Sequence, residues 1–158
     1  MKILFIEDDE DKFKRVVDFI NSDVPGAAVV CARSFNSGLR ALIAEGTSFD
    51  LLLLDMTMPT YDATPEEPGG GAVEHFAGRD LLAQMQLRQI HVPTVVVTML
   101  DSFGEGAKKV SLHALIRELQ GSYGSYFLGH VYYDATKEGW RKSLKDLILK
   151  QQSTKRLA

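Results

Sequence analysis

The stretch Asp50-Leu51-Leu52-Leu53-Leu54-Asp55-Met56-Thr57-Met58-Pro59 decides the fold. Its four consecutive leucines are too few for a helix of ordinary length, and turn-forming residues stand on both sides of them. A short, wholly apolar run of this kind is typical of a strand that is buried on both faces of a parallel sheet. Asp55 ends the run, at the place where functional side chains gather in open α/β sheets. A simple turn-capping role for Asp55 is the alternative.

Four further runs have the composition of strands, and they span residues 3–6, 27–31, 93–98 and 125–133. Apolar residues at helical spacing predict a helix after each strand. The first helix carries its apolar stripe at Phe13, Val16, Val17 and Ile20, and the last begins near Thr136. Strands that alternate with helices indicate βαβ units with right-handed crossovers. We therefore expect an α/β fold with a five-stranded, parallel, doubly wound sheet of flavodoxin-like order.

The composition is that of an ordinary globular domain. The 158 residues suit one domain, which we expect over residues 1–150, followed by a short basic tail at 151–158. The net charge of -3 argues against direct binding of nucleic acid, and no apolar run is long enough to span a membrane. A single cysteine, Cys31, and an N-terminus without a signal-peptide pattern favour the cytoplasm.

Polar side chains follow three of the predicted strands at their carboxyl ends. Glu7 and Asp8 follow the first strand, Asp55 the third and Thr98 the fourth. Carboxylates that share one crevice repel each other unless a cation lies between them, and oxygen ligands select a hard ion such as Mg²⁺. A metal ion beside a carboxylate is suited to phosphoryl transfer, because it neutralises charge on the transferring oxygens. Taken singly, these residues fit helix caps or strand packing equally well.

Three segments together resemble the receiver domain of two-component response regulators: residues 2–10, residues 50–59 and residues 92–98. The resemblance covers the chain from Met1 to about Leu149. The pair of acidic residues after the first strand and the Asp-x-x-Met-Pro element after the third are its most specific parts. The resemblance implies a receiver fold with five βα units.

The resemblance also implies a role for each polar residue. Asp55 is similar to the phosphoacceptor aspartate of the family, and Thr98 matches the Ser or Thr that contacts the phosphoryl group and moves on activation. Mg²⁺ is then expected to bind Asp8 directly, Glu7 through water, the Asp55 carboxylate and the backbone carbonyl of Thr57.

The end of the last strand departs from the family pattern. The family usually has a Lys followed by Pro there, whereas this chain has His130 followed by Val131. In this register Phe127 is the switch aromatic, and a shift by one residue places Tyr126 and Gly129 in the two positions instead. If His130 replaces the Lys, the nearby carboxylates are expected to raise its pKa, and phosphorylation is expected to be slow and faster at lower pH.

The segment at residues 60–77 is a second departure, because it is much longer than the family's usual connection. Prolines, glycines and acidic residues fill it, so we expect a loop. It starts beside Asp55, which favours a recognition surface or a lid. A passive insertion is the alternative, because long surface loops cost little entropy.

These features predict a stand-alone receiver rather than an enzyme. It accepts a phosphoryl group on Asp55 from a histidine kinase or a phosphotransfer protein and changes its contacts with an unidentified downstream protein, as a monomer or weak homodimer. One alternative is a pseudo-receiver that is never phosphorylated, which the missing Lys favours. The other is a phosphohydrolase of the haloacid dehalogenase type, which needs a second Asp where this chain has Thr57.

Overall fold

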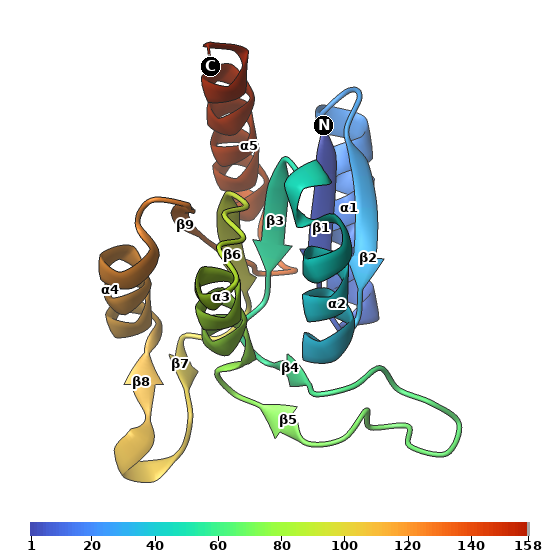
Figure 1. Ribbon diagram of the computed structural model, residues 1–158, viewed down its shortest axis with the longest axis vertical. Helices are drawn as coiled ribbons and strands as arrows, with labels where there is room; N and C mark the ends of the chain where they lie inside the picture. Colours follow the sequence, from blue (N-terminus) through green and yellow to red (C-terminus); the bar gives the residue numbers. More distant parts are fainter. Residues whose placement is uncertain (158) are drawn as a thin grey trace.

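The computed structural model describes residues 1–157 and has a five-stranded parallel sheet at its centre (Figure 1). The order along the sheet is β2-β1-β3-β6-β9: β2 is added on one side of β1 and the later strands on the other, so the winding of the sheet switches between β1 and β3. This order confirms the predicted flavodoxin-like, doubly wound fold. The strands are β1 (Lys2–Ile6), β2 (Ala28–Ala32), β3 (Leu51–Leu54), β6 (Thr94–Thr98) and β9 (Phe127–Tyr132).

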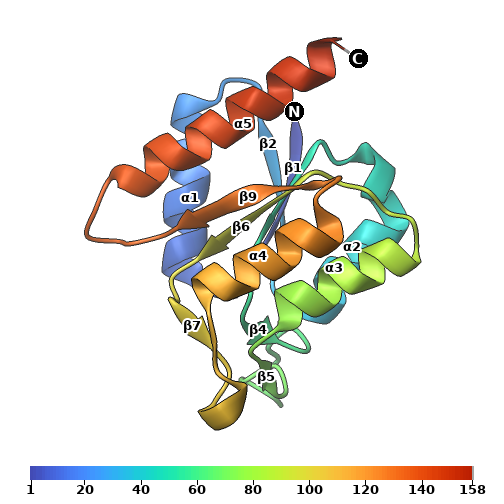
Figure 2. The ribbon, with the colours of Figure 1, turned by 90° about the vertical axis from the view of Figure 1, so that its left-hand side faces the viewer.

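Helices cover both faces of the sheet, as Figure 2 shows. One face is covered by α1 (Glu10–Asp23) and α5 (Gly139–Leu157), and the other by α2 (Phe35–Glu45), α3 (Ala77–Leu87) and α4 (Leu112–Tyr123). Successive side chains of a strand point to opposite faces. Leu51 and Leu53 therefore pack in the core under α1 and α5, while Leu52 and Leu54 pack in the core under the other three helices.

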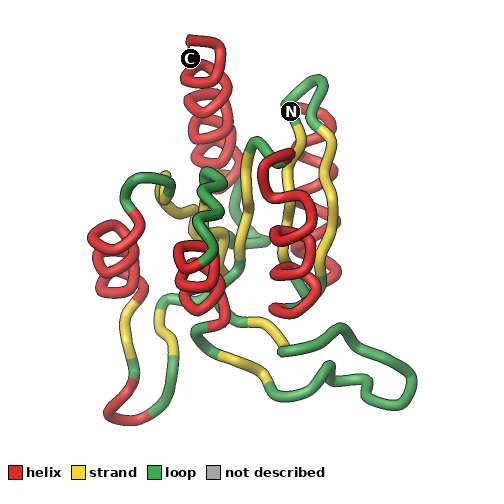
Figure 3. Tube along the Cα trace, viewed as in Figure 1, coloured by secondary structure: helices red, strands yellow, loops and turns green. Residues whose placement is uncertain are grey.

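Two small hairpins extend from the edge of the sheet at which the strands end (Figure 3). One pairs β4 (Met58–Pro59) with β5 (Val73–Glu74), and the other pairs β7 (Ser102–Phe103) with β8 (Val110–Ser111). Neither hairpin was expected from the sequence, because strands of two residues carry no hydrophobic alternation. Short 3-10 helices lie at η1 (Gly46–Ser48) and η2 (Gly106–Lys108).

The long segment at residues 60–77 is anchored to α2. The carbonyl of Thr60 accepts a hydrogen bond from the Asn36 backbone at 3.0 Å. The Ser34 hydroxyl, which caps α2, also donates to a carboxylate oxygen of Asp62 at 2.6 Å. The segment therefore begins as an ordered hairpin against the helix that follows β2.

The last helix differs from the prediction at its start. It begins at Gly139 rather than near Thr136, because the Asp134 carboxylate accepts hydrogen bonds from the Thr136 backbone at 2.9 Å and hydroxyl at 2.7 Å and so holds a turn there. The helix then continues to Leu157 without a break at residue 150, where the domain boundary stays a prediction. Over residues 1–157, no helix combines the length and apolar character needed to cross a bilayer.

Candidate functional site

Two neighbouring strands bring the acidic residues together. Ile6 of β1 lies opposite Leu54 of β3, so the residues that follow them, Glu7 and Asp55, leave the sheet side by side. Glu7, Asp8 and Asp55 each place a carboxylate oxygen within 4.8 Å of the other two. The three carboxylates therefore converge at the carboxyl ends of the strands, as the sequence predicted. Glu7 is fully buried, Asp55 is 7% exposed and Asp8 is exposed, so the group is open to solvent on the Asp8 side.

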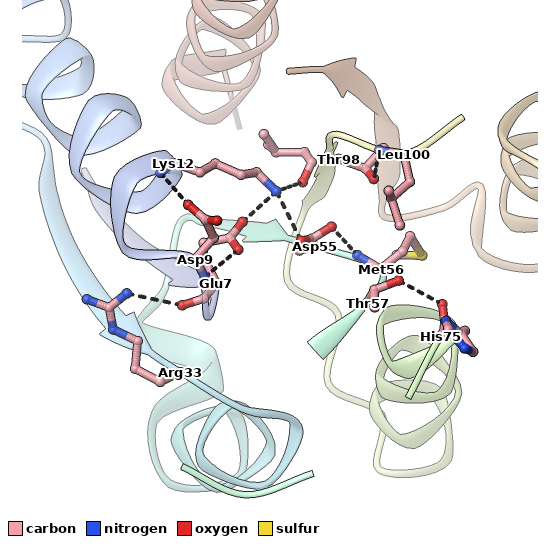
Figure 4. Close-up of polar contacts among 11 residues, drawn as sticks. Glu7, Asp9, Lys12, Arg33, Asp55, Met56, Thr57, His75, Thr98 and Leu100 are labelled. Carbon is pink, nitrogen blue, oxygen red and sulfur yellow. Dashed lines mark hydrogen bonds and ion pairs between the residues drawn. The ribbon is translucent and has the colours of Figure 1, made fainter. Parts of the chain in front are cut away.

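A lysine from α1 lies among these carboxylates. The ammonium of Lys12 is 2.5 Å from Glu7 Oε2 and 3.1 Å from Asp55 Oδ2, and it donates to the Val97 carbonyl at 2.7 Å. The whole residue is 1% exposed. Figure 4 shows Lys12 reaching across from the helix to the ends of the strands. A buried charge needs such partners, since a lone one would cost several kcal/mol or more to desolvate.

Backbone groups hold the two buried carboxylates in place (Figure 4). The Asp9 backbone N–H donates to Glu7 Oε1 at 3.0 Å, and the Met56 backbone N–H donates to Asp55 Oδ1 at 2.7 Å. Asp9 also caps α1, accepting from the Lys12 backbone at 2.7 Å. The cap therefore fixes the start of the helix from which the Lys12 side chain extends.

Burial and mutual charge shift the pKa values of this group in predictable directions. Burial raises the pKa of Glu7 to about 8; the positive charge of Lys12 opposes this rise and the negative charge of Asp55 adds to it. Partial desolvation also raises the pKa of Asp8, and the negative charge of Asp55 adds to this rise. Burial alone would lower the pKa of Lys12, but Asp55 and Glu7 outweigh it and the pKa is raised. Lys12 is therefore a fixed positive charge at neutral pH.

The donor set fits a hard divalent cation. All the candidate ligands are oxygen atoms of carboxyl groups, the ligand type that Mg²⁺ prefers, and a bound cation would favour the ionised form of Glu7. The fourth expected contributor, Thr57, is half-buried, and its hydroxyl donates to the His75 carbonyl at 3.2 Å, which ties the turn after Asp55 to the segment just before α3.

Comparison with curated proteins identifies the family. Over 144 residues the chain is 31% identical to the "Detocs response regulatory protein DtcB" of Enterobacter cloacae (strain JD6301), covering 91% of this chain and 95% of that protein. The chain belongs to the response regulator receiver family. It is also 30% identical over 151 residues to the uncharacterized protein y4jR of Sinorhizobium fredii, covering 94% and 97% of the two chains. No family model matches this receiver.

Solved structures show the same fold at low sequence identity. A response regulator receiver domain from Clostridium thermocellum superposes with a TM-score of 0.64 and 19% identity, covering 99% of this chain and 97% of that one. The Mn(2+)-bound form of response regulator Rcp1 superposes with a TM-score of 0.59 and 17% identity, covering 92% and 90%. These likenesses confirm the fold that the sequence predicted.

Thr98 stands where the receiver resemblance placed it, at the end of β6. It is fully buried, and its hydroxyl accepts a hydrogen bond from the Leu100 backbone at 3.1 Å. The carbonyl of the preceding residue, Val97, is the one that binds Lys12. The end of β6 thus touches the acidic group through Lys12, and the Thr98 side chain is held by the turn that follows.

The last strand of this receiver does not bring its predicted residues to the site. Tyr132, two residues after His130, is level with Thr98, and the one-residue register shift of β9 against β6 near Gly129 accounts for one of these two residues. His130 pairs with Val96, and its side chain is exposed. Partial desolvation by the surrounding protein, together with the nearby His113, lowers the pKa of His130, so the expected rise of that pKa is wrong.

The two aromatic candidates are at the other end of the sheet. Phe127 is the first residue of β9 and pairs with Thr94, the first residue of β6, while its ring is buried in the core. Tyr126, the candidate in the alternative register, is buried too and donates to the Leu82 carbonyl at 3.3 Å. Neither register considered from the sequence reaches the carboxyl end of β9.

Sequence reasoning missed Lys12, although a signal for it exists. The buried positions of α1 are Lys12, Val16, Phe19 and Ile20, which are spaced for one face of a helix. A lysine on the apolar face of a helix requires a buried anion. Glu7 and Asp55, which end two adjacent predicted strands, were the available anions.

Proposed function

We propose that this receiver accepts a phosphoryl group on Asp55, with Mg²⁺ bound by the acidic group, and that phosphorylation changes its affinity for a partner protein. The observation that carries the proposal is the setting of the Asp55 carboxylate. It lies at the carboxyl end of a central strand, within 4.8 Å of Glu7 and Asp8 oxygens and 3.1 Å from the Lys12 ammonium.

The proposed step is a displacement at phosphorus. An Asp55 carboxylate oxygen attacks the phosphorus atom of the donor, and the bond from phosphorus to the leaving group breaks with its electron pair remaining on that group. The Met56 N–H holds the carboxylate in one orientation through its 2.7 Å hydrogen bond. When bound, Mg²⁺ supplies positive charge to the transferring oxygens. Asp8, Glu7, Asp55 and the Thr57 carbonyl are the groups proposed to hold it.

The relatives support the partners that we propose. The Enterobacter cloacae relative is named a response regulatory protein, and Rcp1 is described with Mn(2+) bound. By analogy, the phosphoryl donor of this chain is a histidine kinase or a phosphotransfer protein, and its output is a contact with a downstream protein. In this role the chain is a signalling domain whose covalent state changes, and not an enzyme that releases a product from a separate substrate.

Incubation with acetyl phosphate and Mg²⁺, followed by intact mass measurement, tests the proposal. We expect one added phosphoryl group on the wild-type chain and none on Asp55→Asn, because the amide removes the nucleophilic oxygen pair but keeps the shape. Labelling of Asp55→Asn at the wild-type level would contradict the assignment. A chain that never gains mass would favour the pseudo-receiver, an interaction module without phosphorylation.

Millimolar Mg²⁺ is expected to raise the melting temperature of the unphosphorylated protein. A cation that binds only the folded state stabilises it, and here it also relieves the repulsion between the Asp8 and Asp55 carboxylates. The shift should shrink in Asp8→Asn and persist in Asp11→Asn, which removes an exposed carboxylate outside the group. Equal shifts in the two variants would show that Mg²⁺ binds elsewhere.

A further inference from the structure

We propose that Lys12 supplies, from the first helix, the positive charge that binds the phosphoryl group on Asp55. The inference rests on the proposed phosphorylation of Asp55. It assigns to α1 a role that the sequence pattern assigned to His130 on the last strand. In the described residues, Lys12 is the one side-chain cation paired with Asp55.

The position of the ammonium is fixed by three strands. An ammonium has three N–H donors, and the Lys12 group has three acceptors: Glu7 Oε2 after β1, Asp55 Oδ2 after β3 and the Val97 carbonyl within β6. Of these acceptors, only Asp55 changes chemically in the proposed step. Glu7 and Val97 can therefore hold the ammonium while its third contact changes.

Phosphorylation adds negative charge at Asp55, and Lys12 is placed to neutralise it. With acetyl phosphate as donor, an Asp55 oxygen forms a bond to phosphorus, the bond from phosphorus to the acetyl oxygen breaks, and acetate leaves with the electron pair. The single negative charge of Asp55 becomes the double charge of an acyl phosphate. A buried ammonium 3.1 Å from Asp55 Oδ2 can move its contact to a phosphoryl oxygen through small changes in its four-carbon side chain. It keeps its proton throughout.

The cost of burying Lys12 supports this role over a purely structural one. An apolar side chain at this buried position of α1 would leave no charge to desolvate. Lys14, two residues away on the same helix, has a side chain that is 79% exposed, so its charge stays solvated. Lys12 is 1% exposed and is aimed at the proposed nucleophile.

Labelling rates of matched variants test the inference. Acetyl phosphate with Mg²⁺ is the probe, and added mass is followed over time in wild type, Lys12→Gln and Lys14→Gln. We expect Lys12→Gln to be labelled on the order of a hundredfold more slowly, the loss typical of removing one group that stabilises transition-state charge. Lys14→Gln should be labelled at the wild-type rate, because its side chain faces solvent.

A second pair of variants provides a control in case Lys12→Gln does not fold. Lys12→Gln leaves two buried carboxylates without their cation, so the comparison is repeated between Glu7→Gln and the double variant Glu7→Gln/Lys12→Gln. Both of these lack the Glu7 charge and differ only at Lys12. The same slowing within this pair supports the inference even if Lys12→Gln alone fails to fold.

The Mg²⁺-induced rise in melting temperature provides a readout that does not depend on phosphorylation. We expect the rise in Lys12→Gln to equal or exceed that in wild type, because the substitution removes a positive charge from the surroundings of the cation. The same is expected of the double variant when it is compared with Glu7→Gln.

Slower labelling together with loss of the Mg²⁺-induced rise in melting temperature would mean that the site has collapsed, and it would overturn the inference in favour of a structural role. Unchanged labelling in both pairs would overturn it while leaving Asp55 as acceptor. An unlabelled wild type would defeat the proposed function itself.

Discussion

Gly78→Ala is expected to lower the free energy of unfolding by about 3 kcal/mol, the upper part of the range for overpacking a rigid core. Gly78 lies in the first turn of α3, where its backbone N–H donates to the Met56 carbonyl at 3.0 Å. A methyl group there would stand 2.5 Å from the backbone oxygen of Asp55 and would also overlap the Met56 side chain. The Asp55 backbone cannot retreat, because its N–H is bonded to the Ile6 carbonyl of β1.

Urea denaturation of wild type, Gly78→Ala and Gly121→Ala measures this effect. Gly121 lies in α4 and has open space where its methyl group would go, so its replacement should stabilise the protein by up to about 1 kcal/mol through helix propensity alone. The two substitutions are chemically identical, and the structure predicts opposite signs. If both variants gained stability, α3 would not pack against the Asp55 turn as described.

Glu7→Gln is expected to flatten the dependence of stability on pH between about 4.5 and 8. The pKa of Glu7 is raised in the folded state from 4.5 to about 8, so in this range the folded protein holds a proton that the unfolded chain has lost. This contribution to stability is complete below pH 4.5 and disappears as the pH rises through about 8. Wild type should therefore lose stability with rising pH more steeply than the variant.

Urea midpoints in metal-free buffer at several pH values across this window measure the difference. The neighbouring charges remain in the variant: Lys12 of α1, Asp55 just after β3, and Asp8, whose own pKa is raised in the same direction. A residual slope from Asp8 is therefore expected. Asp11→Asn serves as the control with the wild-type slope. Parallel curves for wild type and Glu7→Gln would show that Glu7 is ionised in the folded protein.

Most of the fold could be predicted because local patterns encode it. Residues 51–54 are apolar throughout and bounded by turn formers, which is the pattern of a strand buried at the centre of a parallel sheet. Glu7 and Asp55 directly follow the strands that precede them in the sequence. The clustering of the acidic side chains then follows from strand order alone, since parallel strands end at one edge of the sheet. The small hairpin of β4 and β5 escaped prediction because it depends on a pairing across the loop that two-residue strands cannot signal.

The end of the last strand and the cation of the site could not be predicted in the same way. β9 shifts by one residue against β6 near Gly129, which has a φ of 143°, and this shift moves Tyr132 to the place level with Thr98. A glycine within a strand hints at a bulge but does not place it. Lys12 contacts residues that are far from it in the sequence, so only the folded structure joins it to Asp55.

The central claim, that Asp55 is the phosphoacceptor of this receiver, is tested most directly by locating the added group. Borohydride reduces an acyl phosphate on aspartate to homoserine, so the protein is incubated with acetyl phosphate and Mg²⁺, reduced, digested and sequenced by mass spectrometry. We predict homoserine at position 55 and at no other aspartate, and none when acetyl phosphate is omitted. Homoserine at Asp8 or another acidic residue, with Asp55 intact, would contradict it.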